Sequence, residues 1–322
     1  MKRRDFLKTI AAVGLASTVT KSSQLYGIDK QAGLLSRRPL GKTGENLSII
    51  GFPGIALKEM EQKKADKLVS DAVEAGVNYF DVAPTYGNSE EILGPALEPF
   101  RRNVFLACKS AKRMGSELTE EMHISFRKLK TDHFDLYQLH ALTSLDDIKT
   151  AFGSGGALEA VTKAKKEGKI RYIGFSAHSV EAAMEALENY DFDSILFPVN
   201  FATWYKGNFG KEVVSYAKNR GAGVLAIKSM AFSRWKKGAV RTHSTWYEPL
   251  TNIEEANLGL RFTLSLPVTA AVPPGDEELF RLALRLAPSF IPLTQKEKSY
   301  LEKKSAEAIP VFEYPSDKFN II

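Results

Sequence analysis

The stretch NYFDVAPTYG, residues 78–87, decides the fold. Residues 78–82 form a short apolar run of β-forming type that Pro84 interrupts, which predicts a strand delivering Asp81 to its C-terminal end. Tyr86 follows in the loop just beyond, so a carboxylate and a phenol can converge on one point. Because Asp and Pro are also ordinary turn residues, this stretch alone is compatible with a strand that simply ends in a polar turn.

Two later stretches repeat the pattern. The run VFLAC at 104–108 is followed by Lys109, and FDLYQL at 134–139 is followed by His140. In a parallel barrel the C-terminal strand ends share one face, and that face carries the chemistry. Three successive strands with polar residues at this position predict a catalytic group made of Asp81, Tyr86, Lys109 and His140.

Strand-like and helix-like segments alternate from residue 49 onward, which is typical of βα units around a parallel sheet. With eight strands, the simplest way to close the sheet is an α/β fold of the (β/α)₈ TIM barrel type. A doubly wound sheet is the alternative, but no G-x-G-x-x-G follows the first strand. We expect strands near residues 49–52, 78–82, 103–108, 134–139, 170–175, 194–199, 223–228 and 269–273, and helices that include 63–75, 158–167, 180–189, 211–219 and 253–264.

With the motifs FDVAPTYGNSE, ACKS and LYQLH, the sequence resembles the aldo-keto reductase family over roughly residues 38–286. The resemblance implies hydride transfer between a nicotinamide cofactor and a carbonyl, with Tyr86 as general acid. It also implies that Lys109 lowers the pKa of Tyr86, that Asp81 holds Lys109 and that His140 orients the carbonyl. Residues 38–48, which have the pattern of a β-hairpin with a Gly-rich turn, would then plug the bottom of the barrel.

The cofactor positions depart from the commonest pattern of that family. Ala177 follows Ser176 where the family has Asn, so His178 either replaces that contact or only begins a helix. Lys228 stands where many members have a Tyr that stacks on the nicotinamide. A Lys at this position is similar to another branch of the family. The resemblance implies a cofactor site that includes Gly54, Ile55, Ser176, His178, Asn200, Lys228, Met230 and Gly275.

The choice between NADP and NAD rests on the last predicted helix. NADP is the family default, but Asp276, Glu277 and Glu278 occupy the first turn and would repel a 2′-phosphate. Arg281 and Arg285 follow and could compensate for the acids. Alternatively, the acids only complement the helix dipole. Both cofactors remain open at this point.

Residues 229–251 are long for a βα loop and rich in aromatic and basic side chains. Together with the aromatic residues of 201–205, they are candidates for stacking on a substrate or for covering the cofactor, since long ordered loops are commonly functional. A self-packed surface loop is the alternative interpretation.

The composition is that of a globular enzyme, with 322 residues, 44% hydrophobic and 25% charged. Residues 1–23 hold five basic side chains and one acidic one, which leaves +2 of the formal charge of +6 to the rest of the chain. No basic stripe with interleaved aromatics suggests nucleic acid. Because Cys108 is the only cysteine, an intramolecular disulfide and a cysteine-based metal cluster are excluded. We expect Cys108 to be a buried small hydrophobe, although its place beside Lys109 leaves a redox role open.

The first 37 residues predict an export signal and a polar tether. Residues 38–322 are expected to form the barrel, including a helical extension at its C-terminus. Arg3 and Arg4, followed by Phe6 and Leu7, are typical of a twin-arginine signal, and the weakly apolar run 9–19 is too short to span a bilayer. This predicts export to the periplasm by the twin-arginine machinery and no stable membrane span. A basic amphipathic start without signal function is the alternative.

Together these features predict an exported NAD(P)(H)-dependent oxidoreductase that reduces an aldehyde, ketone or sugar-like carbonyl, or oxidises the corresponding alcohol. The alternative is a nucleotide-binding redox sensor or interaction module with little turnover. The complete catalytic group favours the enzyme, because a sensor does not need all four side chains. The altered nicotinamide pocket favours the sensor.

Overall fold

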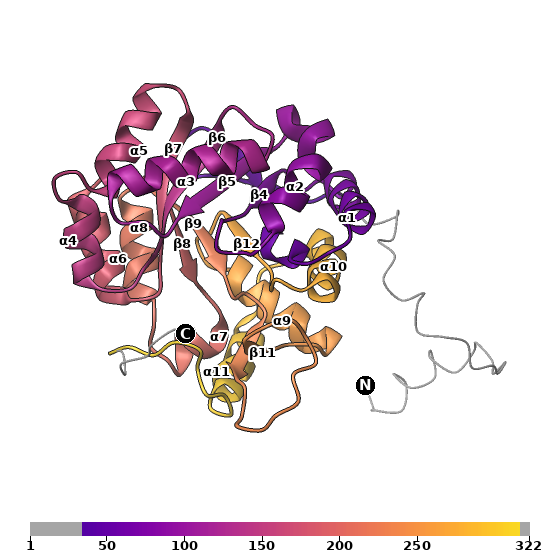
Figure 1. Ribbon diagram of the computed structural model, residues 1–322. Coiled ribbons are helices and arrows are strands. Elements are labelled where there is room, and N and C mark those ends of the chain that lie inside the picture. Colours follow the sequence, from indigo (N-terminus) through magenta and orange to yellow (C-terminus); the bar gives the residue numbers. More distant parts are fainter. Residues whose placement is uncertain (1–33, 316–322) are drawn as a thin grey trace, which may run out of the picture.

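A barrel of eight parallel strands organises the molecule, as a computed structural model describing residues 34–315 shows (Figure 1). The predicted twin-arginine signal lies outside the described residues. The strands are β3 (Phe52–Pro53), β4 (Tyr79–Asp81), β5 (Phe105–Ser110), β6 (Phe134–Leu142), β7 (Ile170–Ala177), β8 (Ser194–Pro198), β9 (Gly223–Ile227) and β12 (Ala270–Val272).

The barrel is closed between its first and last strands. Strands β3 to β9 pair in chain order and β12 pairs with β9. Gly51 N donates to Ala271 O at 2.9 Å, and Ala271 N donates to Ile49 O at 2.8 Å, which joins the segment before β3 to β12. The predicted (β/α)₈ barrel is therefore confirmed, with each expected strand present to within a few residues.

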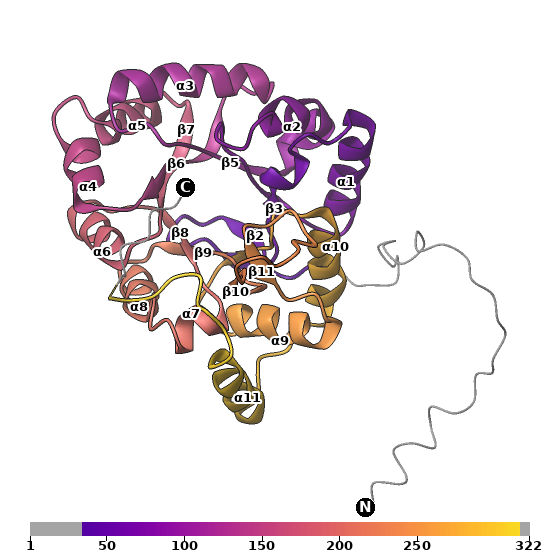
Figure 2. The same ribbon diagram turned by 60° about the horizontal axis from the view of Figure 1, so that its bottom comes forward.

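Helices surround the strands as an outer ring, which is plain when the molecule is turned (Figure 2). The α-helices are α1 (Gln62–Glu74), α2 (Ser89–Leu97), α3 (Gly115–Lys128), α4 (Leu145–Phe152), α5 (Ala157–Lys166), α6 (Val180–Asn189), α7 (Phe201–Tyr205), α8 (Lys211–Asn219), α9 (Ile253–Leu264), α10 (Glu277–Leu286) and α11 (Gln295–Ser305). Short 3₁₀ turns are η1 (Gly54–Leu57), η2 (Glu98–Asn103) and η3 (Ala287–Ser289). No helix within residues 34–315 is both long and apolar enough to cross a bilayer.

The helices form because their apolar residues recur at helical spacing. In α1 the buried residues are Ala65, Leu68, Val69 and Ala72, the stripe that an amphipathic helix turns toward a core. Helix α4 begins at Ser144, whose hydroxyl accepts from Asp147 N in a capping box. All five helices named from the sequence are confirmed.

A β-hairpin closes the bottom of the barrel. Strands β1 (Arg37–Pro39) and β2 (Asn46–Ser48) pair antiparallel, and Leu40 and Leu47 pack fully buried against the inward-facing residues of the barrel strands. Gly41 has φ +51°, and a Cβ there would lie 2.2 Å from the Gly221 carbonyl oxygen, so only glycine fits this close approach. The predicted hairpin plug is thus present.

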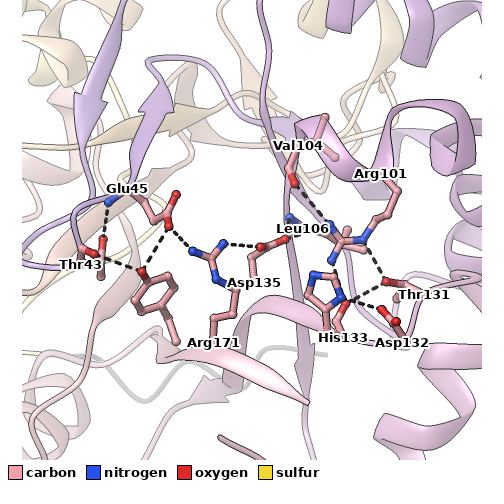
Figure 3. A network of polar contacts seen from close by, with 11 residues as sticks. Thr43, Glu45, Arg101, Val104, Leu106, Thr131, Asp132, His133, Asp135 and Arg171 are labelled. Atoms are coloured by element: carbon pink, nitrogen blue, oxygen red, sulfur yellow. Dashed lines mark hydrogen bonds and ion pairs between the residues drawn. The ribbon is translucent and has the colours of Figure 1, made fainter. Parts of the chain in front are cut away.

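An ion network ties this hairpin to the N-terminal ends of the strands (Figure 3). The Asp135 carboxylate accepts from Arg101 at 3.0 Å and from Arg171 at 2.8 Å. Arg171 also donates to Glu45 in the hairpin turn, and the Tyr172 hydroxyl donates to the same Glu45 oxygen at 3.2 Å. The network lies at the end of the barrel where strands begin, away from the predicted catalytic face.

A second hairpin lies within the long segment 229–251. Strands β10 (Ala231–Arg234) and β11 (Tyr247–Pro249) pair antiparallel, so this predicted loop is an ordered element. Its connection reaches helix α10, because Ser244 N donates to Asp276 Oδ2 at 3.1 Å. The hairpin thereby brings Trp246 and Tyr247 to the C-terminal ends of the barrel strands.

Candidate active site

The centre of the site is a buried ion pair between neighbouring strands. Lys109 on β5 is fully buried, and its Nζ donates to Asp81 Oδ1 and to the Val82 carbonyl oxygen at 3.2 Å. Burial by itself would lower the pKa of Lys109, but Asp81 and the Tyr86 phenol more than offset it, so the pKa lies above its ordinary value. Lys109 is therefore a charged ammonium at neutral pH, as the sequence predicted.

Tyr86 lies in the loop after β4, beside this ammonium. Lys109 Nζ is 5.1 Å from the centroid of the Tyr86 ring, and the loop is held by a hydrogen bond from Tyr86 N to Ala83 O at 3.0 Å. Burial raises the pKa of Tyr86 above its ordinary value, while Lys109 lowers it by a smaller amount. Lys109 therefore acts on the pKa of Tyr86 in the predicted direction, and burial keeps the phenol protonated at neutral pH.

His140 completes the group from strand β6. Its ring packs edge-on against the Tyr86 ring, with centroids 5.9 Å apart. Nδ1 lies 3.4 Å from the Thr85 hydroxyl. Burial first, and then the Lys109 charge, keep the pKa of His140 well below its usual value, so the ring is neutral at neutral pH. The four residues predicted from the sequence are therefore brought together.

Two supporting residues were not foreseen. Tyr79 donates its hydroxyl hydrogen to Asp81 Oδ2 at 3.1 Å, and Gln138 Nε2 donates to the same oxygen at 3.2 Å. Each lies two positions before a residue of the predicted catalytic group, on the strand that carries it. Since alternate residues of a strand face the same side, this spacing was the signal that could have identified them.

A cavity of about 660 Å³ opens over these residues at the C-terminal ends of the strands. It is lined by Asp81, Tyr86 and His140, together with aromatic and small side chains. The predicted cofactor residues that line it are Gly54, Ile55, Ser176, His178, Lys228 and Gly275. Asn200 and Met230 do not belong to the lining.

Asn200 and Met230 have structural positions instead. Asn200 Oδ1 accepts from Thr203 N at 2.9 Å and caps α7, although its buried Nδ2 has no hydrogen-bond partner in the part of the chain that the structure describes. Met230 is fully buried in the hydrophobic core. Ser176 differs from both, because its hydroxyl oxygen accepts from Ala141 N at 2.7 Å within the cavity wall and its own hydrogen stays available to a ligand.

His178 and Lys228 also belong to the lining. His178 stacks on Phe312, both ring nitrogens are buried without a hydrogen-bond partner among the described residues, and burial lowers its pKa to about 3. The cap of α6 is Ser179, so His178 is not the residue that begins that helix. Burial also lowers the pKa of Lys228, to about 8, and its Nζ lies over the rings of Trp246 and Tyr247.

The acids at the start of α10 are already engaged. Asp276 Oδ1 accepts from Glu278 N and Leu279 N and caps the helix. Glu277 pairs with Lys64 and with Arg281, and Arg281 also pairs with Asp71. Arg281 therefore offsets the charge of Glu277 and Asp71 in this structure, and its role toward a 2′-phosphate stays a prediction.

Two further expectations are settled by packing. Trp204 and Tyr205 pack against Phe262 rather than lining the cavity, so the suggested stacking role of residues 201–205 is wrong. Cys108 is buried as expected, and burial raises the pKa of its thiol well above the usual value. Within residues 34–315, no three His, Cys, Asp or Glu side chains are grouped to hold a metal ion.

Comparisons with known proteins agree with this geometry. The model of the Aldo/keto reductase family matches residues 49–256. The uncharacterized oxidoreductase YqkF of Bacillus subtilis is 28% identical over 309 residues, covering 85% of this chain and 98% of that protein. L-galactose dehydrogenase of Arabidopsis thaliana is 28% identical over 222 residues, covering 60% and 65% of the two chains.

A solved structure shares the fold. The holo form of the aldo-keto reductase AKR11C1 from Bacillus halodurans superposes with a TM-score of 0.69 at 24% identity, covering 86% of this chain and 98% of that one. At this level of identity the likeness supports the barrel itself, and the chemistry must be argued from the side chains.

Proposed function

The chain belongs to the aldo/keto reductase family and is an oxidoreductase of that family, and from this premise we propose that it reduces an aldehyde, ketone or sugar-like carbonyl by hydride transfer, with Tyr86 as general acid. Oxidation of the corresponding alcohol is the same reaction in reverse. The observation that carries the proposal is the buried Asp81–Lys109 pair beside Tyr86, with His140 at the same end of the cavity.

Each side chain has a defined task in this reaction. When bound, a nicotinamide dinucleotide supplies the hydride. Tyr86 is protonated at neutral pH and donates its proton to the carbonyl oxygen as negative charge develops there. The Lys109 ammonium stabilises the phenolate that remains, and Asp81 keeps Lys109 charged and in place. The His140 ring nitrogen that does not face Thr85 can hydrogen-bond the same oxygen.

The cavity residues fit a nicotinamide dinucleotide. Ser176 presents a hydroxyl hydrogen that a carboxamide oxygen could accept. Gly54 and Gly275 lie where the backbone must approach closely, since a Cβ on Gly275 would lie 2.1 Å from a methyl carbon of Ile55. Gly54, Ile55, Ser176 and Gly275 are the residues that would hold the group. We propose NAD rather than the family default NADP, because the start of α10 offers acids and a committed arginine.

The test of the proposed function is the Tyr86→Phe variant. We expect carbonyl reduction to fall by a factor of about 10² to 10⁴, the usual contribution of a positioned general acid, while nucleotide affinity stays within about threefold. Multiple-turnover rates over a panel of aldehydes, ketones and sugars give the first quantity, and nucleotide titration gives the second. Turnover near the wild-type rate would show that Tyr86 is not the acid. Absence of turnover by the wild type with the whole panel would favour the sensor.

We also propose that the protein is exported in folded form by the twin-arginine pathway, with its nucleotide already bound. The proposal rests on Arg3 and Arg4 in the N-terminal sequence. Cell fractionation of the chain and of an Arg3→Lys, Arg4→Lys variant tests it. Export predicts a periplasmic wild type and a retained variant, whereas the same distribution for both would exclude this route.

A further inference from the structure

The proposed reaction leaves one charged group of the cavity unused, the ammonium of Lys228. The residue directly follows β9 and lines the cavity with a half-buried side chain. Its φ is +68°, a left-handed conformation that costs a residue with a Cβ roughly 1–2 kcal/mol. Backbone strain of this kind persists where the surrounding structure requires it, which is often at ligand sites.

The ammonium of Lys228 is held by two aromatic rings, whereas the common partner of a lysine is a carboxylate. Lys228 Nζ lies 5.2 Å from the centroids of both Trp246 and Tyr247, which the second hairpin supplies. Cation–π contacts stabilise a cation without neutralising its charge. Among residues 34–315 no Asp or Glu pairs with Lys228. The ammonium can therefore bind an incoming anion.

The rest of the lining does not offset this charge. Within residues 34–315, Asp81 is the only carboxylate that lines the cavity, and it is paired with Lys109. His140 and His178 are neutral at neutral pH, because burial and then the neighbouring cations lower the pKa of each. Lys228 contributes to the lowered pKa of both histidines, so its charge acts at the end of the cavity that holds the catalytic group. A cavity with this balance attracts anions.

Building on the function proposed above, we propose that Lys228 binds a carboxylate of the carbonyl substrate, so that the enzyme prefers aldehydes or ketones that carry an acid group. One ammonium matches the single charge of a carboxylate. A small molecule can place its acid group at Lys228 and its carbonyl at Tyr86 within one cavity of about 660 Å³. A charge-assisted hydrogen bond of this kind is stronger than one between neutral groups.

The experiment compares 4-carboxybenzaldehyde with methyl 4-formylbenzoate, which have the same reacting group but differ in charge. We expect wild-type kcat/KM to be at least about tenfold higher for the acid. In Lys228→Met the acid-to-ester ratio should fall toward one, and in Lys228→Arg it should be largely retained. Lys236→Met is the matched control, because it removes an exposed charge from the same loop outside the cavity, and its ratio should equal that of the wild type.

Calorimetric titration of the nucleotide-free protein with benzoate and with benzamide gives a readout that needs no turnover. The inference requires that benzoate binds more tightly and that Lys228→Met removes the difference. Equal efficiency with both aldehydes in the wild type would overturn the inference and leave the proposed function standing. A Lys228→Met variant with weaker nucleotide binding and an unchanged acid-to-ester ratio would also overturn it, because the ammonium would then serve the cofactor. If neither aldehyde is turned over, the carbonyl panel still decides the proposed function, and the benzoate titration decides the inference.

Discussion

Burial and charge act against each other at the two residues on which the chemistry depends, Lys109 and Tyr86. Burial favours the neutral form of both groups, but Asp81 keeps Lys109 charged. Tyr86 therefore holds its proton at neutral pH and has a cation beside it for the moment at which the proton leaves. This arrangement suits an acid that must stay protonated until the carbonyl oxygen gains negative charge.

The state of His140 gives a prediction for the pH profile. Because the pKa of His140 lies well below its ordinary 6.5, the ring is already neutral at pH 6 and gains no proton as the pH falls from 7.5 to 6. The kcat for reduction of a neutral aldehyde should therefore be flat over this interval. Stopped-flow rates under saturating conditions measure it, with protein fluorescence at each pH as the control for folding. An inflection near 6.5 would mean that His140 titrates normally and that its assigned role is wrong.

How far single residues can be predicted depends on whether their partners are close in sequence. Asp81, Lys109 and His140 were predictable because each lies at or near the C-terminal end of a strand, and these strand ends of a parallel barrel meet on one face. The pairing of Arg281 with Asp71 was not predictable, because it joins α10 to α1 across more than two hundred residues. The capping role of Asn200 had a local signal, since Asn is a favoured N-cap residue, but the family resemblance suggested a ligand instead.

Among the elements, α10 is the one on which the proposed preference for NAD rests. Its first turn carries Asp276, Glu277 and Glu278, and Ser244 N from the long loop donates to Asp276 Oδ2. The carboxylate of Asp276 thus occupies the backbone N–H groups that would otherwise be available to an anion. A 2′-phosphate would meet these acids, whereas the ribose hydroxyl of NAD carries no charge.

We therefore expect the Kd of NADP to be at least about threefold weaker than that of NAD. In Asp276→Asn, which can keep the cap, the loss of one negative charge should lower the ratio of the NADP Kd to the NAD Kd about fivefold relative to the wild type, in line with a contribution of roughly 1 kcal/mol at a helix terminus. Fluorescence titration with both nucleotides measures the ratio. Glu254→Gln, in the first turn of α9 outside the cavity, is the matched control. NADP binding tenfold tighter than NAD would reverse the assignment.

Elements with a clear period were predicted well, and irregular ones were not. All eight barrel strands and the first hairpin follow from apolar runs and turn residues. Helix α2 was not predicted because Gly94 and Pro95 interrupt its apolar pattern. Gly94 is nevertheless needed where α2 meets the end of α3, since a Cβ there would lie 2.2 Å from the Lys128 carbonyl oxygen. The hairpin of β10 and β11 was expected only as a long loop, because its strands are short and irregularly paired.

At the scale of the whole molecule, the two ends of the barrel have different roles. The C-terminal strand ends carry the catalytic group and the cavity, whereas the N-terminal ends carry the hairpin plug and the network around Asp135 (Figure 3). Polar residues at the bottom of such barrels are expected to serve stability rather than chemistry. The side chain of Asp135 is only 5% exposed and meets two arginines, so its charge cannot be lost without leaving them poorly compensated.

This division predicts that stability and catalysis can be separated by Asp135→Asn. We expect a loss of about 3 kcal/mol in the free energy of unfolding, the lower end for a broken buried pair, because the Arg171 side chain is 46% exposed. Urea denaturation measures the loss, and kcat/KM under native conditions should stay within about twofold of the wild type. Glu98→Gln is the control, since its pair with Lys130 is solvent-exposed on both sides and should contribute less than about 1 kcal/mol. A large fall in kcat/KM of folded Asp135→Asn would show that the bottom of the barrel governs the geometry at its mouth, and that the two ends are not independent.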